Sequence, residues 1–252
     1  MKSKHLIPLA FVTLAGFLPP SKASIFLGLA DRFAVLGGSG VTSTGNTVLN
    51  GDLGVSPGTA ITGFAPGIVN GAIHNNDAVA IQAQTDALAA YNSLAGETPN
   101  QNLTGQDLGG QTLNPGVYYF SSSAQLTGTL TLSGTGDFVF QIGSTLTTAS
   151  SSSVLLINGA QADNVFWQIG SSATVGDGTS FDGSIIADSS ITMDTGASLS
   201  GRALALNGAV SLDDNRITIV PEAGAFWPLV FCTSVFGARE WLVMRRRKSG
   251  RS

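Results

Sequence analysis

Few side chains in the sequence could perform acid–base or nucleophilic chemistry. The 252-residue chain has two histidines, His5 and His74, and one cysteine, Cys232. No partner motif accompanies His74, and a general base needs a positioned partner, so we interpret this histidine as a structural hydrogen-bonding residue. A single cysteine excludes an intrachain disulfide and a cysteine-based metal site. The sequence therefore predicts no catalytic residues, no cofactor and no enzyme.

Carboxylates are the other candidates for chemistry, since pairs of them can act as acid and base or bind metal ions. Asp213 and Asp214 are adjacent in the run SLDDN, but such a pair is typical of a turn between strands. The same interpretation applies to four further residues near expected turns, which are Asp177, Asp182, Asp188 and Asp194. The sequence contains neither the calcium-binding nonapeptide repeat nor an EF-hand loop. We predict no metal site, with weak Ca²⁺ binding at these turns as the alternative.

A different pattern, of small, apolar and hydroxyl-bearing residues in that order, recurs through the chain. It occurs in the segments SGVTS (39–43), TAITG (59–63), SSAQL (122–126), STLTT (144–148), SSATV (171–175), SSITM (189–193) and GAVSL (208–212). In a strand, alternate side chains point to opposite faces. The apolar members are therefore expected to enter a core, and they are Val41, Ile61, Ala124, Leu146, Ala173, Ile191 and Val210.

Two columns of small side chains would then face outward. The first column consists of Thr42, Thr62, Gln125, Thr147, Thr174, Thr192 and Ser211. The second column lies two residues earlier in each segment and consists of Gly40, Ala60, Ser123, Thr145, Ser172, Ser190 and Ala209. These columns carry no charge and would present a flat grid of hydroxyl and methyl groups, which suits binding. The alternative is that serine and threonine are simply good solvent-facing strand residues.

The spacing of the segments indicates the fold that positions these columns. Thr174, Thr192 and Ser211 follow one another at intervals of 18 and 19 residues, the length of one coil with three short strands. Two other series keep step with them. FVFQI, VFWQI, GSIIA and GRALA form a more apolar series, and TLTLS, SVLLI, TSFDG and ASLSG form a third. The sequence predicts an all-β, three-sided parallel β-helix, which is a solenoid of stacked coils.

Residues 76–95 break this pattern and predict one long α-helix. The segment NDAVAIQAQTDALAAYNSLA is rich in alanine, begins with an Asn or Asp cap and is followed by a glycine. Ile81, Leu88, Tyr91 and Ala95 form an apolar stripe along it. We expect this stripe to pack lengthwise on one side of the β-helix, so that this side cannot serve as an exposed binding face.

Composition agrees with a strand-rich domain and excludes one class of partner. Hydrophobic residues make up 43% of the chain, enough for a sizeable core, whereas charged residues make up only 11%. The net charge of −4 conceals an asymmetry, because basic residues crowd the C-terminus at Arg239, Arg245, Arg246, Arg247, Lys248 and Arg251. The body is therefore more acidic than the total, and we predict no nucleic-acid partner.

The first residues of the chain have the features of a targeting segment. Residues 1–23 start with Lys2 and Lys4, continue through an apolar run and finish with Ser-Lys-Ala, as a secretory signal peptide does. We therefore expect residues 24–219 to be an exported domain of a bacterium, either secreted or held at the cell surface or in the extracellular matrix.

The last residues resemble a PEP-CTERM sorting signal, whose partner is an exosortase-type sorting enzyme. Residues 220–252 place Val-Pro-Glu before an apolar segment and then an Arg/Lys cluster, which would stay on the cytoplasmic side. Pro-Glu-Ala stands here in place of the usual Pro-Glu-Pro, and Arg239 with Glu240 interrupts the apolar run. An uncleaved anchor is the alternative, and contact with a membrane is expected only through this tail.

Long stretches of the body are similar to the DUF3494 ice-binding (antifreeze) protein family. The similarity lies in FAVLGGSGVTSTGNTVLNGDLGVSPGTAITGF, LNPGVYYFSSSAQLTGTLTLSG, GRALALNGAVSLD and the run from FVFQIGSTLTT to FDGSIIA, and it covers nearly all of residues 26–219. The resemblance implies a right-handed, three-sided β-helix with a helix packed alongside. It also implies a protein that adsorbs to ice through one flat face and inhibits ice growth and recrystallisation.

Carried over position by position, the resemblance places the ice-binding face on the two columns. The candidate residues are Thr42, Thr62, Ser123, Gln125, Thr145, Thr147, Ser172, Thr174, Ser190, Thr192, Ala209 and Ser211. Gln125 departs from the hydroxyl pattern, and Gly40, Ala60 and Ala209 have no hydroxyl, which limits the extent of the face. The expected partner is the surface of an ice crystal, bound by a monomer. The alternative function is a structural or adhesive β-helix module of the extracellular matrix without ice activity.

Overall fold

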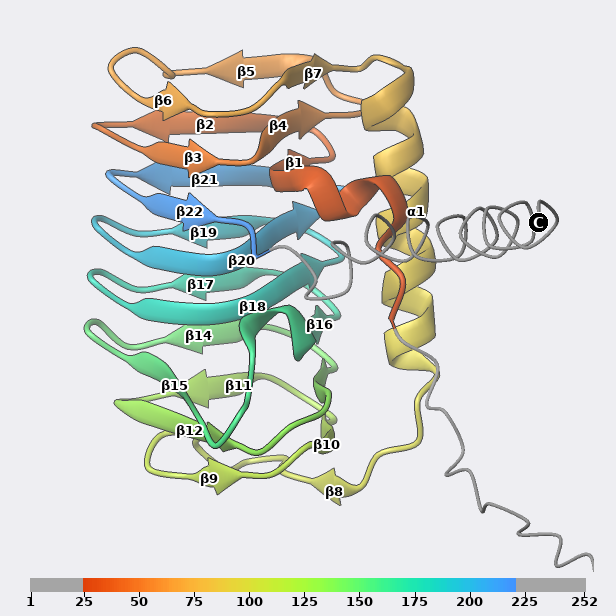
Figure 1. Ribbon diagram of the computed structural model, residues 1–252, viewed down its shortest axis with the longest axis vertical. Coiled ribbons are helices and arrows are strands. Elements are labelled where there is room, and N and C mark those ends of the chain that lie inside the picture. Colours follow the sequence, from red (N-terminus) through yellow and green to blue (C-terminus); the bar gives the residue numbers. More distant parts are fainter. Residues whose placement is uncertain (1–24, 221–252) are drawn as a thin grey trace, which may run out of the picture.

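The computed structural model describes residues 25–220, which form two parallel β-sheets and one long helix (Figure 1). The strands of both sheets are stacked as successive coils, with the helix beside them. Within residues 25–220, the predicted combination of parallel β-structure with one long α-helix is confirmed. The expected signal peptide at 1–23 and, apart from Val220, the expected sorting tail at 220–252 lie outside the described residues.

The smaller sheet has seven strands and contains the hydroxyl-bearing segments of the sequence repeat. Its strands in order are β11 (Ala124–Leu126), β14 (Leu146–Thr148), β17 (Ala173–Val175), β19 (Ile191–Met193), β21 (Ala209–Asp213), β2 (Gly40–Thr44) and β5 (Ala60–Thr62). Each strand pairs in parallel with its neighbours. The segments found in the sequence therefore form one ladder.

The larger sheet has fifteen strands in two arms that share its two longest strands, β18 (Ser180–Ala187) and β20 (Ser198–Ala205). The first arm continues through β9 (Thr112–Leu113), β12 (Thr129–Ser133), β15 (Ser153–Ile157), β22 (Arg216–Thr218), β3 (Val48–Asn50) and β6 (Ile68–Val69). The second arm continues through β8 (Gln101–Asn102), β10 (Gly116–Phe120), β13 (Phe138–Ile142), β16 (Val165–Ile169), β1 (Phe33–Gly37), β4 (Asp52–Val55) and β7 (Ile73–Asn75).

The two arms diverge at a pair of glycines. Gly183 of β18 and Gly201 of β20 lie opposite each other, with φ of 111° and 152°. A side chain would be strained there, and a Cβ on Gly201 would lie 2.0 Å from the Gly183 carbonyl oxygen. Each long strand therefore turns from the first arm into the second at its glycine. The two further series found in the sequence correspond to these two arms.

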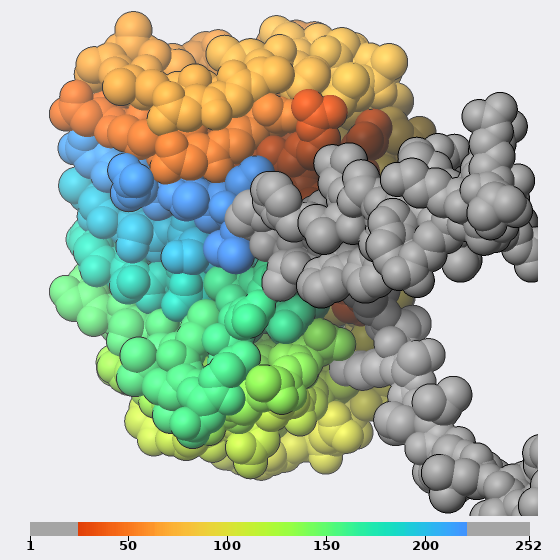
Figure 2. All heavy atoms as spheres, in the orientation of Figure 1, coloured from red at the N-terminus to blue at the C-terminus, as the bar shows by residue number. Residues whose placement is uncertain are grey.

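The coils do not follow one another along the stack in chain order. The chain starts with β1, continues through β2, β3 and β4, of which β4 pairs with β1, and adds β5 to β7 at one end of the stack. It then runs beside the stack as α1 (Ala78–Ala95) (Figure 1). It resumes at β8 at the other end and returns coil by coil until β21 and β22 pair with β2 and β3. In Figure 2 the blue residues of the last coil lie directly against the orange residues of the first.

Inward side chains of both sheets form one apolar core. All seven residues predicted to point inward belong to this core or pack against it, with Ile61 of the terminal coil only partly buried. Aromatic side chains on neighbouring strands of the second arm stack within it. The ring centroids of Tyr118 and Phe140 are 5.4 Å apart, and those of Phe140 and Trp167 are 4.0 Å apart. This packing holds the coils in a fixed register.

A second core lies between the second arm and α1. The helix therefore covers one side of the β-structure, as predicted. Strands β13 and β16 are buried at every position, because one face meets the inner core and the other meets the helix. The helix begins after Asp77, whose side chain caps the N–H groups of Val79 and Ala80. At its other end, Gln141 Nε2 donates to the carbonyls of Leu94 and Glu97 over 2.7 and 2.8 Å.

The prediction of which helix residues pack against the sheet was wrong. Ile81 and Leu88 are 50% and 49% exposed, Ala95 is exposed, and only Tyr91 packs against the edge of the second core. The buried stripe consists of Ala80, Ala83, Ala87, Ala90 and Leu94. Small alanines let the helix approach a sheet whose outward residues, such as Leu36, Val139 and Phe166, already fill the space. The bulkier helix residues are therefore placed toward solvent.

Candidate functional site

The first predicted column lies in register across the whole smaller sheet. Direct cross-strand partners link its members in the order Gln125, Thr147, Thr174, Thr192, Ser211, Thr42 and Thr62. The exposed side chains of this column are Gln125, Thr147, Thr42 and Thr62. The half-buried ones are Thr174, Thr192 and Ser211. The sequence thus predicted which residues share this outward face.

The second predicted column flanks the first. Gly40 pairs with both Ala60 and Ala209, and Ser123, Thr145, Ser172 and Ser190 immediately precede their strands. Two contacts join hydroxyls of this column to the next coil. Thr145 Oγ1 donates to Ser123 Oγ over 2.8 Å, and the Ser190 N–H donates to Ser172 Oγ over 3.3 Å. These contacts fix side chains that would otherwise sample several rotamers.

The face contains a seam between the two ends of the described chain. Thr42 of β2 and Ser211 of β21 are cross-strand partners separated by 169 residues in sequence, and Thr42 Oγ1 donates to Ser211 Oγ over 3.4 Å. In the turns that follow β2 and β21, the same seam is closed by the Asn46 N–H, which donates to Asp214 Oδ1, and by the Asn215 N–H, which donates to Thr47 Oγ1. Rungs from both ends of the chain therefore form one continuous surface.

The corner beside the seam carries functional candidates that the sequence interpretation missed. A hollow of about 440 Å³ opens there, lined among others by Thr42, Thr44, Thr195, Ser211 and Asp213. Thr44 lies two residues beyond Thr42 on the same outward face of β2, so the alternation Thr-x-Thr was the signal that could have identified it. Asp213 was interpreted only as a turn residue. It does end β21, but its carboxylate also contacts hydroxyls of two other coils.

Electrostatics distinguish the columns from this corner. Every residue of both columns is uncharged, whereas the corner carries Asp177, Asp194 and Asp213. Hydrogen bonds from Thr195 and Thr44 lower the pKa of Asp213 below its ordinary value of 3.8, because both hydroxyls donate to its ionised form. The flat face therefore has a neutral surface with a negative border on one side.

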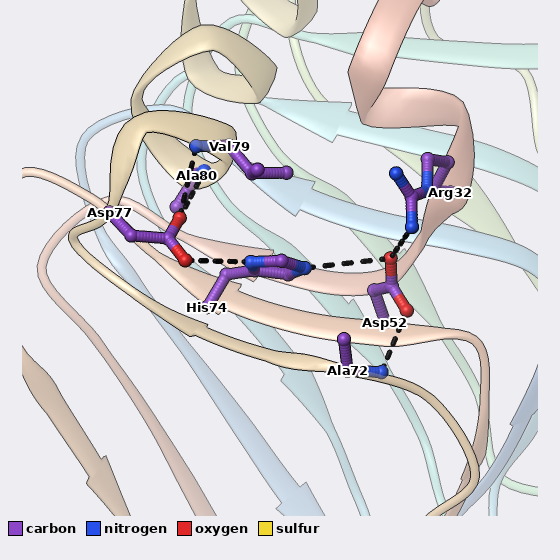
Figure 3. Close-up of polar contacts among 7 residues, drawn as sticks. All are labelled: Arg32, Asp52, Ala72, His74, Asp77, Val79 and Ala80. Carbon is purple, nitrogen blue, oxygen red and sulfur yellow. Dashed lines mark hydrogen bonds and ion pairs between the residues drawn. The ribbon is translucent and has the colours of Figure 1, made fainter.

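His74 lies in a polar cluster that fastens the helix to the coils (Figure 3). Its Nδ1 is 2.8 Å from Asp77 Oδ2, and its Nε2 is 3.7 Å from Asp52 Oδ2. Asp52 in turn pairs with Arg32 over 3.3 Å and accepts a hydrogen bond from the Ala72 N–H. Both ring nitrogens thus face carboxylates that are already occupied by structural contacts, in agreement with a structural role for this histidine.

Residues 25–220 contain neither a metal-binding cluster nor a membrane-spanning helix. This part of the chain has no group of three or more His, Cys, Asp or Glu side chains placed to hold a metal ion. Nor does it contain a helix with the length and apolarity needed to cross a bilayer. The candidate functional site is the uncharged face of the smaller sheet, whose first column lies in register on all seven strands.

Comparison with known protein families assigns the chain. Residues 35–218 match the model of a family described as ice-binding-like, which spans nearly all of the coils. The chain belongs to the ice-binding-like family. The predicted family is thereby confirmed. Members that are similar to this chain include an ice-binding protein of Nostoc sp. (strain HG1), 58% identical over 222 residues, with 85% of this chain and 82% of the relative covered.

Further relatives in the ice-binding-like family extend the similarity to sequence and structure. An ice-binding protein of Flavobacterium frigoris (strain PS1) is 35% identical, with 77% of this chain and 75% of the relative covered. The crystal structure of an ice-binding protein from an Antarctic biological consortium has a TM-score of 0.76 at 47% identity, covering 85% of this chain and 96% of the other. An Arctic yeast ice-binding protein has a TM-score of 0.74 at 34% identity, covering 79% and 97%.

Proposed function

We propose that this protein adsorbs to ice through the face formed by the two columns, and that adsorption inhibits ice growth and recrystallisation. The observation that carries the proposal is the in-register ladder from Gln125 to Thr62, which keeps an uncharged side chain on every rung. Two relatives whose similarity covers 77% or more of this chain are named ice-binding proteins, and this supports the same function here.

The spacing of the face suits an ordered layer of water. Neighbouring rungs lie about 4.8 Å apart and alternate outward residues of one strand about 6.6 Å apart, which gives a grid that repeats in two directions. Threonine is β-branched and has few rotamers, so the hydroxyl and methyl positions vary little. The three consecutive threonines Thr147, Thr174 and Thr192 form the most regular part of this grid. Water held on such a grid can match the repeat of an ice surface.

The consequence of adsorption follows from the shape of the ice front. Ice can advance only between adsorbed molecules, so the front bulges there. A convex front is less stable than a flat one and melts at a lower temperature. Growth therefore stops over a range of temperatures below the melting point, and small crystals no longer feed larger ones. No reaction is catalysed, and we propose that the protein is not an enzyme.

We also propose a three-sided, right-handed coil. Three lines of parallel pairing support three sides, since the smaller sheet and the two arms of the larger sheet each contribute one line. Parallel crossover connections are right-handed in almost all proteins, which supports the handedness. The proposed face then occupies one side, α1 covers a second, and the first arm forms the third.

The cellular setting remains a proposal from the sequence. Residues 1–23 would direct export, residues 24–219 would be the working domain, and residues 220–252 would be the sorting signal or anchor. The domain would act as a monomer outside the cell, where it meets ice directly.

Partition into ice tests the function. A cooled probe is grown into an ice hemisphere in a dilute solution of the purified protein, and the protein content of the ice is compared with that of the liquid. An ice-binding protein is enriched in the ice, because adsorbed molecules are engulfed. Exclusion of the folded protein from ice, as for serum albumin run in parallel, would contradict the proposal and favour a matrix module.

A further inference from the structure

Asp213 holds hydroxyl groups of two neighbouring coils at the border of the proposed face. Its Oδ1 accepts a hydrogen bond from Thr44 Oγ1 over 2.7 Å, and its Oδ2 accepts one from Thr195 Oγ1 over 2.5 Å. Thr44 belongs to β2, Asp213 ends β21, and Thr195 follows β19, so the contacts span three consecutive coils and cross the seam. All three residues line the hollow that also contains Thr42 and Ser211.

These contacts decide in which direction each hydroxyl donates. A hydroxyl has one hydrogen to donate and two lone pairs that accept. When the hydrogen of Thr44 or Thr195 points at the carboxylate, the oxygen can offer only acceptor sites to water. An ionised carboxylate accepts from both sides and cannot donate, so both hydroxyls are held in the same sense. Without it, the Thr195 hydroxyl could rotate and either donate or accept, and the Thr44 hydroxyl could turn between water and the Leu212 carbonyl, which lies 3.3 Å away.

We propose that Asp213 is a positioning residue of the ice-binding face, which fixes the Thr44 and Thr195 hydroxyls as acceptors for the first layer of water on both sides of the seam. This inference rests on the proposed function and extends the face beyond its two columns into the corner. Water molecules in the hollow must then donate to these two oxygens, which imposes an orientation on the water that continues along Thr42 and Ser211.

An exchange of Asp213 for asparagine separates hydrogen-bond direction from shape. The amide has nearly the shape of the carboxylate but presents one acceptor and one donor, so one of the two threonine hydroxyls must reverse. Asp214→Asn is the matched control, because it removes the same charge one residue away. The Asp214 carboxylate contacts neither hydroxyl, and an asparagine in its place keeps an oxygen that can accept the Asn46 N–H, so the contact that closes the seam is retained. Asparagine also tolerates the φ of 52° at this position.

Thermal hysteresis of the full chain is the first readout, at equal protein concentration and with unfolding temperatures recorded. We expect a partial loss of thermal hysteresis in D213N and none in D214N. The pH profile is the second readout. The wild-type value should hold from neutral pH down to the ordinary carboxyl pKa of 3.8 and fall only below it, where Asp213 gains a proton and becomes a donor. The D213N profile should lack that step.

The outcomes distinguish this inference from the function on which it rests. If the wild-type protein has no thermal hysteresis, the proposed function fails. If the wild type is active and D213N retains its full activity, or loses no more than D214N, the inference fails and the function stands. D213N could also lose activity together with a large fall in unfolding temperature. Asp213→Ser is then compared with it. If D213S unfolds at the wild-type temperature and is fully active, the role of Asp213 is structural and the inference is also overturned.

Discussion

Thr42 and Ser211 are direct cross-strand partners on the proposed face, although 169 residues separate them in sequence. The face is therefore completed only when the first coils of the described chain pair with the last. Two rungs, those of Thr42 and Thr62, come from the first coils, and the other five come from the returning coils. The extent of the surface thus depends on closure of the stack at this seam.

Arg202 should stabilise this closure more than any exposed ion pair does. It is 1% exposed, and its guanidinium donates to the Asp31 carbonyl over 2.7 Å and to the Val220 carbonyl over 3.2 Å, joining both ends of the described chain. We expect Arg202→Met to lower the free energy of unfolding by on the order of 3 kcal/mol, because the half-buried Asp31 carboxylate and the two carbonyls lose the buried guanidinium that pairs with them. Urea unfolding followed by circular dichroism measures the change.

Arg32→Gln provides the comparison for that experiment. Arg32 pairs with Asp52, but its side chain is 58% exposed, so the loss should stay under about 1 kcal/mol. Equal effects of the two substitutions would show that Arg202 does not have the closing role assigned to it.

Close packing of the alanine stripe predicts a sharp difference between two helix positions that are two residues apart. Ala87 is fully buried against the second core, whereas Ala89 is exposed. Ala87→Leu should push α1 away from the sheet and cost about 1–3 kcal/mol of stability. Ala89→Leu should change stability by less than about 0.5 kcal/mol. Thermal unfolding of both variants tests this, and a tolerated A87L would mean that the helix does not lie as close to the sheet as described.

Asp182 predicts a stability change with a defined pH dependence. Burial raises its pKa above the ordinary value of 3.8, and a hydrogen bond from Ser200 opposes this only in part. The folded state therefore binds this proton more tightly than the unfolded state does, so the contribution of Asp182 to stability falls as pH rises from 3.8 through the raised pKa. Asp182→Asn should raise the unfolding temperature at pH 7.

The advantage of the D182N variant should shrink as the pH is lowered through the raised pKa toward 3.8, and it should be lost below 3.8, where the wild-type residue is protonated in both states. Asp177→Asn at an exposed turn controls for the loss of one negative charge. A lower unfolding temperature for D182N at pH 7, or a gain equal to that of D177N, would contradict the assigned effect of burial.

Much of the fold could be predicted because inside and outside alternate locally along each strand. Ile191 and Thr192 are adjacent, and their types alone indicate which one enters the core. The same rule predicted the first column, whose members proved to be cross-strand partners. The ice-binding role of the columns, the handedness and the targeting segments stay predictions, since none of them follows from strand pairing.

Two features could not be predicted, for different physical reasons. Coils of similar sequence stack equally well in several orders, so the pattern alone did not indicate that β2 would pair with β21. The helix stripe was misjudged because Ile81 and Leu88 are more apolar than alanine, whereas close approach to a filled sheet selects small side chains. The contact between Asp213 and Thr44 depends on the unpredicted coil order and was missed with it.

The central claim is tested most directly by thermal hysteresis and ice-crystal shape for Thr192→Tyr. Thr192 lies between Thr174 and Ser211 in the ladder, and its neighbours Ile191 and Met193 stay in the core, so a tyrosine should project from the face without disturbing the fold. Thr131→Tyr places the same ring on an outward position of the larger sheet. We predict faceted crystals and full thermal hysteresis for the wild type and T131Y, and loss of most of the hysteresis for T192Y. Undiminished activity in a folded T192Y would place the ice-binding surface elsewhere and contradict the account.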